Sequence, residues 1–137
     1  MRIFSSGGVS INNTTDPGAG NLSVTGTVSD TAGNVRSVPI NSQSGAYILA
    51  ASDNGKMVSI TTGGVTVNNS IMSAGMVVTV YNNSASSQTI TQGTGVTLQW
   101  AGQSSSTTGN RTLGLYGMAT IVFLSASSAV ITGSGLT

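Results

Sequence analysis

Met76-Val77-Val78-Thr79-Val80-Tyr81 is the most apolar run in the middle of the chain, and Asn82-Asn83-Ser84 follow it directly. Valine and threonine are branched at Cβ, which favours extended backbone over helix. Asparagine and serine are frequent in turns, because their short polar side chains hydrogen-bond to nearby backbone groups. The run therefore predicts a strand in the centre of a β-sheet, followed by a turn.

Further segments of the same kind lie on both sides of this run, from Gly45 to the end of the chain. Turn signals such as Asn54-Gly55 and Gly63-Gly64 separate them at intervals of roughly 8 to 12 residues, a spacing typical of a sandwich or barrel. No apolar stripe with helical spacing persists beyond one turn. We expect residues 46–137 to form an antiparallel β-sandwich of about eight short strands. Besides 76–81, the expected strands are 46–50, 57–61, 65–67, 88–91, 96–100, 118–124 and 129–132.

The first 45 residues have a different composition, with both prolines and two of the three aspartates of the chain. Val9-Ser10-Ile11 and residues 22–28 alternate with period two, and Thr15-Asp16-Pro17-Gly18 between them has the residue types of a tight turn. Two short strands cannot enclose a core. Residues 1–45 are therefore expected to form an extended arm that pairs with, or wraps around, the same segment of neighbouring chains.

The side chains that most enzyme chemistry requires are missing from the sequence. Serine, threonine, asparagine and glycine make up 71 of the 137 residues, whereas cysteine, histidine and glutamate do not occur. Cysteine catalysis, Ser-His-Asp hydrolysis and zinc binding each lack a required residue type. For a Ca²⁺ or Mg²⁺ ion, Asp16 or Asp53 would supply one carboxylate per chain. We expect no enzyme activity, no cofactor and no resident metal.

The net charge and the length of the apolar stretches argue against two further classes of protein. A formal net charge of +1 is too small to neutralise many phosphates, which argues against nucleic-acid binding. The longest apolar stretch, 118–124, is far shorter than the roughly 20 residues of a membrane-spanning helix.

Two phenylalanines, one tryptophan and three tyrosines supply little bulk for a core. Burial between identical chains would add apolar contacts, so we expect an obligate homo-oligomer.

The segment Val9 to Gly26, which includes Asp16-Pro17-Gly18 and Leu22-Ser23-Val24-Thr25-Gly26, resembles the short motif of bacteriophage tail-fibre shafts. The rest resembles a β-rich terminal domain of tail-fibre and other virion structural proteins of tailed phages. The segments that carry this second resemblance are 47–50, 53–56, 60–65, 81–84, 88–93, 108–113, 117–120 and 131–136.

The resemblance implies a homotrimeric virion component with an N-terminal attachment arm and a C-terminal β-sandwich head. In such a protein the arm would dock on other tail or baseplate proteins. The residues expected to make this attachment lie at the start of the chain: Arg2, Ile3, Phe4, Val9 and Ile11.

Trp100 is the first candidate for contact with a receptor. Its ring could stack on a sugar while Gln99 and Gln103 hydrogen-bond to the sugar hydroxyls, although packing in the core or between chains is the simpler interpretation. Arg111 could bind an acidic group of a glycan or pair with Asp53 of a neighbouring chain, and the few charges in the sequence favour the second interpretation.

Tyr81, Asn82 and Asn83 form a second candidate group of an aromatic ring and two amides. The alternative interpretation is ordinary turn chemistry, because Asn-Asn after a strand is a common turn sequence.

The combined expectation is a trimeric phage tail fibre that adheres to host-surface glycan through many weak, neutral contacts. Its partners would be copies of itself, other tail proteins and the glycan, and its location would be the virion. The alternative is a capsid decoration protein that bridges capsomers. A tailspike depolymerase comes third, because such enzymes use two carboxylates close together and this chain has three scattered aspartates.

Overall fold

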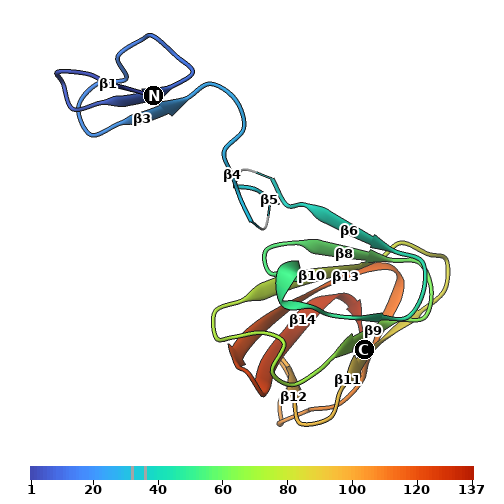
Figure 1. Ribbon diagram of the computed structural model, residues 1–137. Coiled ribbons are helices and arrows are strands. Elements are labelled where there is room, and N and C mark those ends of the chain that lie inside the picture. The colour runs from blue at the N-terminus through green and yellow to red at the C-terminus, as the bar shows by residue number, and fades with distance from the viewer. Residues whose placement is uncertain (32, 36) are drawn as a thin grey trace. The chain divides into compact units, whose positions relative to one another are not determined.

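The computed structural model describes residues 1–31, 33–35 and 37–137 and shows an all-β protein. Two compact units follow each other along the chain, Met1–Ser37 and Val38–Thr137 (Figure 1). The predicted boundary near residue 45 falls inside the second unit, because β6 (Ile40–Gln43) pairs with β8 (Met57–Ile60). Within the described residues, no helix is long and apolar enough to cross a membrane.

The first unit contains a three-stranded sheet and a small hairpin. β2 (Val9–Ile11) is antiparallel to β1 (Arg2–Ile3) and parallel to β3 (Leu22–Val24). Strands are thus present on either side of the Pro17 turn, as predicted, but the second ends at Val24 rather than at residue 28. The sheet order is β1 (Arg2–Ile3), β2 (Val9–Ile11), β3 (Leu22–Val24), and the hairpin pairs β4 (Ser29–Asp30) with β5 (Gly33–Asn34).

This unit encloses almost nothing. Among its residues for which burial is described, only Gly8 and Ser10 are buried, whereas Ile3 is 68% exposed and Leu22 is 64% exposed. Polar contacts hold its loops instead. Asp16 accepts hydrogen bonds from the Ser6 hydroxyl at 2.7 Å and from the Gly18 N–H at 2.9 Å. The described part of the first unit therefore has no apolar core.

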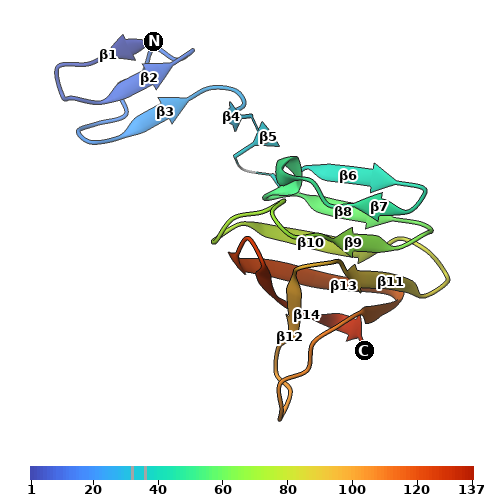
Figure 2. The ribbon, with the colours of Figure 1, turned by 60° about the horizontal axis from the view of Figure 1, so that its bottom comes forward.

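In the second unit, the chain winds between two columns of stacked parallel strands. Each strand pairs with the next but one along the chain, so Ile40, Met57 and Thr79 lie side by side in the first column. Figure 2 shows the strands of both columns stacked one below another. The first column is β6, β8 and β10 (Val77–Asn82), and the second is β7 (Tyr47–Ile48), β9 (Val65–Val67) and β11 (Gln88–Gln92).

This pairing corrects the predicted antiparallel arrangement. Strands that follow each other directly, such as β8 and β9, belong to different columns, and within each column the pairs are parallel. Antiparallel pairing in the second unit begins only where the last strands close the ladder. The sheet is therefore mixed.

One long strand, β13 (Arg111–Ser125), closes both columns. Its second half is antiparallel to β10 and its first half is antiparallel to β11, so a single strand covers the last edge of each column. β14 (Ser128–Leu136) is antiparallel to β13, and β12 (Thr97–Trp100) is parallel to β14. β10 thus lies between β8 and β13, which confirms the central position predicted for residues 76–81.

Side chains alternate between the core and the outside along these strands. On β10, Val78, Val80 and Asn82 are buried and the residues between them are partly exposed. The buried apolar side chains of the described chain form a single cluster that extends from Leu49 to Leu136. The second unit therefore encloses a core that one chain supplies.

The chain completes one coil each time it passes through both columns, and two glycines permit successive coils to stack at one corner. Gly63 and Gly64 join β8 to β9 with φ angles of 81° and 70°, a left-handed region that favours glycine. A Cβ atom on Gly63 would collide with the backbone of Ala46 in the preceding coil, and one on Gly64 would collide with the Thr89 carbonyl in the following coil. Only glycine fits between the neighbouring coils here.

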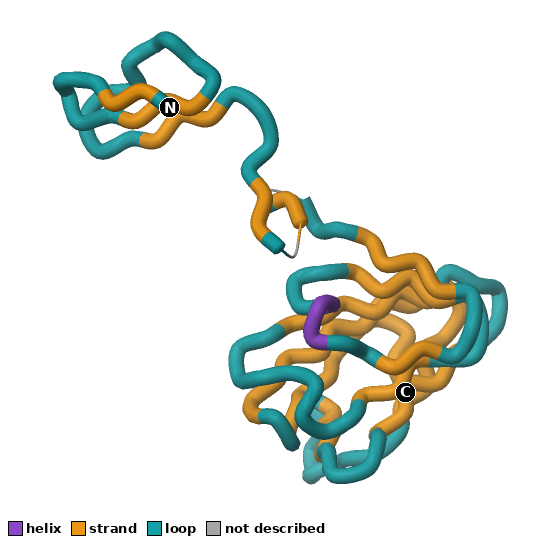
Figure 3. Tube along the Cα trace, in the orientation of Figure 1, coloured by secondary structure: helices purple, strands orange, loops and turns teal. Residues whose placement is uncertain are grey.

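A buried carboxylate ties the first coil together. Asp53, at the end of the short 3₁₀ helix η1 (Ala51–Asp53) drawn in Figure 3, is 1% exposed. Its oxygens accept hydrogen bonds from Asn41 Nδ2, the Tyr47 hydroxyl and the Ala50 N–H, each at 2.8 Å. These partners lie on β6, on β7 and just before η1. Asp53 is thus held within its own chain, which corrects its proposed pairing with a neighbouring chain's Arg111.

Tyr47 makes the stability of this network dependent on pH. Burial raises the pKa of the Tyr47 hydroxyl above its ordinary value of 10.0, and its hydrogen bond to Asp53 raises it further. In the unfolded chain Tyr47 ionises at its ordinary pKa, which is lower than its pKa in the folded protein. The stabilisation of the folded state by the neutral hydroxyl is therefore complete below pH 10, and it is lost as the pH rises from there through the folded pKa.

We therefore expect the free energy of unfolding to fall as the pH rises above about 10, and Tyr47→Phe to remove part of that fall. The same substitution should cost about 1 to 2 kcal/mol at pH 7, because Asp53 loses a hydrogen bond. Urea unfolding of both proteins at pH 7, 9, 10 and 11 measures this. An identical slope against pH in the two proteins would contradict the assignment.

Candidate functional surface

Trp100 and Arg111, two separate candidates from the sequence, lie together in the structure. The Arg111 guanidinium lies over the Trp100 ring, with 5.2 Å from Cζ to the ring centroid. Arg111 is 9% exposed and donates hydrogen bonds to the carbonyls of Thr108 at 3.0 Å and Gly109 at 3.4 Å. The ring of Trp100 is partly buried against the core. A cation held on an aromatic ring in this way stabilises the loop that joins the two residues.

Gln99 contributes to the same loop closure. Its Nε2 donates to the Trp100 carbonyl at 3.1 Å, and its Oε1 accepts from the Ser106 hydroxyl at 2.9 Å. Gln103, by contrast, is exposed and makes no hydrogen bond within the described chain. Arg111 is 9% exposed and already bonded to two carbonyls, which argues against an acidic glycan as its ligand. Trp100 packs partly against the core, which favours the packing interpretation.

Asn82 is a structural residue, which corrects its place among the receptor contacts. Its side chain is fully buried. Nδ2 lies 2.8 Å from the Ser86 carbonyl, 2.8 Å from the Gly114 carbonyl and 3.1 Å from the Leu113 carbonyl, and Oδ1 accepts from the Ser84 hydroxyl at 2.7 Å. The amide thus joins the end of β10 to β13.

The other two members of that group, Tyr81 and Asn83, point outward and have polar neighbours. Tyr81 pairs in register with Ser59 of β8, and Ser59 pairs with Ser42 of β6, so their three side chains share the outer face of the first column. Two residues further along, Ser44, Thr61 and Asn83 form the next outward row. Backbone bonds from Thr61 N to the Gln43 carbonyl and from Asn83 N to the Ile60 carbonyl continue the ladder there.

The two rows enclose a shallow pocket of about 230 Å³ at the C-terminal ends of β6, β8 and β10. We call the serine, threonine and asparagine residues that line it, Ser42, Ser44, Ser59, Thr61 and Asn83, the polar array; Gln43 completes the lining. Sequence reasoning found only Asn83 of this set. The others come from separate segments that the coil brings together, and a lone serine or threonine carries no sequence signal.

Besides Tyr81, a second aromatic residue lies at this end of β10: Tyr116, which the sequence pattern did not single out. Its ring is 60% exposed, its φ is 53°, and its N–H donates to the Ser84 carbonyl at 3.4 Å, which places it at the same end of β10. Gly114 and Gly117 flank it in the stretch where the register of β13 against β14 shifts. A tyrosine in left-handed backbone is uncommon, and such strain occurs preferentially at binding sites.

The opposite end of the same outer face is apolar. Val77, Val122 and Val130 are adjacent across β10, β13 and β14, and Ile40 is adjacent to Met57. Ile40 is 61% exposed. We call Ile40, Met57, Val77, Val122, Leu124 and Val130 the apolar stripe.

The apolar stripe carries no charge. No aspartate, glutamate, lysine, arginine or histidine lies in the outward rows that contain it, which include Thr79, Thr120 and Thr132 besides the stripe itself. Ile40, Val122 and Leu124 are exposed, whereas Met57, Val77 and Val130 are partly buried. Exposed apolar side chains on one face of a sheet mark a candidate interaction site.

The residues expected to attach the protein to the virion lie in the sheet of the first unit. Arg2 and Ile3 on β1 pair with Ser10 and Val9 on β2. The Arg2 guanidinium lies 5.7 Å from the centroid of the Phe4 ring. Ile11 is 40% exposed at the end of β2. The structure thus gathers the predicted attachment residues on two neighbouring strands and the loop between them.

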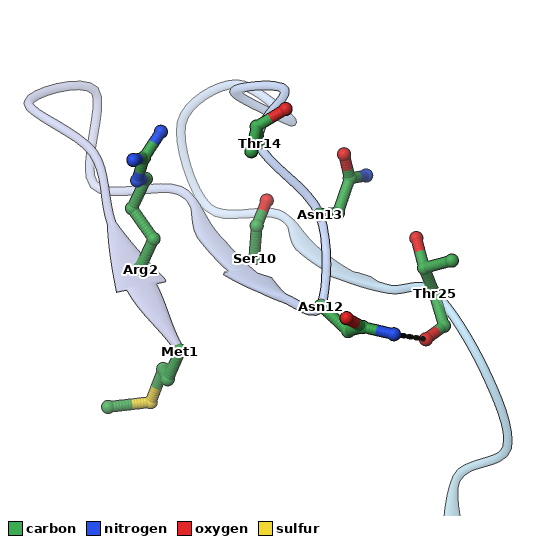
Figure 4. Close-up of a pocket in the computed structure, with 7 residues that line it drawn as sticks. All are labelled: Met1, Arg2, Ser10, Asn12, Asn13, Thr14 and Thr25. Carbon is green, nitrogen blue, oxygen red and sulfur yellow. Dashed lines mark hydrogen bonds between the residues drawn. The ribbon is translucent and has the colours of Figure 1, made fainter.

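The same sheet forms one wall of a concavity of about 560 Å³, shown in Figure 4 and lined by Met1, Arg2, Ser10, Asn12, Asn13, Thr14 and Thr25. Most of its amides are already used within the unit. Asn12 Nδ2 donates to the Thr25 carbonyl at 3.3 Å, and Asn13 Nδ2 donates to the Ser23 hydroxyl at 3.1 Å. Both amides of this concavity are therefore occupied, whereas the hydroxyls of Thr14 and Thr25 make no hydrogen bond within the described chain.

The chain was compared with known protein families, with curated proteins and with solved structures, and none of the three comparisons found a match.

Proposed function

We propose that the protein is a homotrimeric subunit of a bacteriophage tail fibre, attached to the virion by its first unit and adhering to host-surface glycan by its second. The apolar stripe is the observation that carries the proposal. It crosses five neighbouring strands, β6, β8, β10, β13 and β14, and it is uncharged. Identical copies can therefore bury it against one another without charge repulsion. Burial of its side chains contributes roughly 25 cal/mol per Å².

The first unit supports the same proposal from another direction. A sheet of three short strands with exposed Ile3 and Leu22 and no apolar core gains stability when other chains cover it. Three copies at the end of a fibre, or a socket in the tail, would supply that cover. In this arrangement the head is the part that folds around its own core, and the first unit is the part that requires a partner.

Adhesion fits the remaining surface. The second unit exposes hydroxyls and amides and few charges, so its contacts with a cell surface change little with salt. Individually weak contacts become strong when three heads per fibre bind together.

Light scattering of the purified full chain tests the assembly directly. We expect a trimer, and we expect Val122→Asp to shift it to monomer, because three unpaired carboxylates would be buried in the interface. Thr89→Asp is the matched control: it adds the same charge to the outer face of the second column and should leave the trimer intact. A wild-type monomer, or equal loss of trimer in both variants, would reject the proposal.

A binding assay tests the adhesion. Retention of the trimer on bacterial cells or their lipopolysaccharide is the expected result. Retention on phage capsids alone would assign the protein to capsid decoration.

A further inference from the structure

We propose that the polar array binds one neutral sugar residue of a bacterial surface polysaccharide, with Tyr81 as the stacking platform. The proposal rests on the adhesive function proposed above and names the site and the class of ligand. The site lies at the C-terminal ends of β6, β8 and β10, on the outer face of the first column.

The first argument is that the array has free hydrogen-bonding groups. The hydroxyls of Ser42, Ser44 and Ser59 and the carboxamide of Asn83 make no hydrogen bond within the described chain. Ser59 is only 7% exposed, and its hydroxyl makes no hydrogen bond. Every fully buried side-chain nitrogen or oxygen of the described residues has a partner, so the Ser59 oxygen is not fully buried and opens into the pocket. Elsewhere the amides of Asn82, Gln88 and Gln92 are all used internally.

The second argument is geometric. Stacked parallel strands lie about 4.8 Å apart, and alternate residues along a strand are about 6.6 Å apart, so the array presents its groups on a flat grid. Hydroxyl oxygens accept and donate, and a carboxamide does both with separate atoms. A pyranose ring offers hydroxyls around its edge that likewise donate and accept. A surface that combines both types of group can therefore satisfy several hydroxyls of one ring.

The third argument is the aromatic ring beside the array. Tyr81 stands in register with Ser59, next along the outward row, and is partly exposed. The face of an aromatic ring packs against the C–H face of a sugar, while the tyrosine hydroxyl remains available to water or ligand. Tyr116, exposed at the same end of β10, provides a second ring nearby.

Charge and size select the ligand class. None of the residues that line the pocket is acidic or basic, so a sialic acid or a phosphorylated sugar would leave its charge without a partner. The volume of about 230 Å³ lies below the roughly 300 to 1,000 Å³ of sites for larger ligands, which suits a single ring. The arrangement thus favours one neutral hexose or N-acetylhexosamine, bound weakly at each head.

A titration of the isotopically labelled full-length protein, followed by two-dimensional NMR, tests the site. The probes are glucose, galactose, mannose and N-acetylglucosamine, each to about 100 mM, since a one-ring site of this kind is expected in the millimolar range. At least one sugar should shift the amide signals of the polar array. Shifts at residues 101–110 around Trp100 instead, or none with any of the four sugars, would overturn the proposal.

Variants separate the roles of the side chains. Tyr81→Ala and Ser59→Val should each weaken binding roughly tenfold, and Tyr81→Phe should keep it within about threefold because the ring remains. Ser104→Ala, which removes an exposed hydroxyl from the 101–110 loop, is the control and should change nothing. Asn83→Ala removes an exposed amide and serves if a buried substitution disturbs folding. Unchanged affinity in both Tyr81→Ala and Asn83→Ala would contradict the site.

These outcomes differ from a failure of the proposed function. A protein that forms trimers but binds no sugar at the array keeps its proposed assembly and loses only this site. A protein that binds a sugar there as a monomer keeps the site and loses the trimeric fibre.

Discussion

Asn82→Ala should lower the free energy of unfolding by about 3 to 5 kcal/mol, the largest effect we expect from any single polar substitution in the chain. The side chain is 0% exposed and bonds to carbonyls of both the following turn and β13. Alanine leaves the buried Leu113 carbonyl and the partly buried carbonyls of Ser86 and Gly114 without this donor. An unsatisfied buried acceptor costs about 1 to 3 kcal/mol. Urea unfolding at fixed protein concentration, followed by Trp100 fluorescence, measures the change.

Asn83→Ala is the matched control for this measurement. It removes the same group from the next residue, which is exposed, and we expect a change below about 0.5 kcal/mol. Asn82→Asp adds a sharper test, because a carboxylate would face carbonyl oxygens. It should be the least stable variant at neutral pH and should recover in part as the pH falls toward about 4, since these surroundings raise the pKa of the new carboxyl above its unfolded value. Equal stability of the Asn82→Ala and Asn83→Ala proteins would disprove the structural role.

Asp53→Ala should cost about 3 to 4 kcal/mol, because it leaves three partly buried donors without their acceptor and empties a buried site. The loss should appear first in residues 40–50, since the carboxylate joins β6 and β7 to η1. Hydrogen exchange of these amides, together with thermal unfolding, checks both expectations.

Asp53→Asn keeps the shape of the side chain but can accept at one atom only, so it should lie between wild type and alanine. Ser52→Ala, at the exposed neighbouring position of η1, should leave both measurements unchanged. Uniform loss of protection across the whole second unit would mean that the first coil is not a separate cooperative segment.

Most of the second unit's strands were predictable, and two were not. Residues 57–60, 65–67 and 77–82 alternate apolar and polar side chains, which is a local signal. Ile40–Gln43 has a single apolar residue and becomes a strand only because β8 offers it an edge. The first half of β13 was missed because Gly114 and Gly117 interrupt its pattern, whereas the pairing with β11 holds it extended.

The candidate site was predictable to a smaller extent. Tyr81 and Asn83 stood out because an aromatic ring and an amide are adjacent in the sequence. Ser42, Ser59 and Thr61 did not, since their shared surface exists only after three coils stack. Trp100 and Arg111 stood out in the sequence as candidate receptor contacts, but in the structure the guanidinium lies 5.2 Å from the centre of the Trp100 ring, so the two side chains contact each other.

Residue types alone determined that this protein is built of strands and which positions along several of them face inward. Branched Cβ atoms and the two-residue alternation act within a few neighbouring residues, so any sheet would show them. Tertiary structure alone decided that strands pair with the next but one and in parallel. The alternation of apolar and polar side chains along a strand does not depend on which strand lies beside it or on the direction of that neighbour. The choice of partner therefore depends on turns far apart in the sequence, such as Gly63-Gly64, where successive coils are in contact.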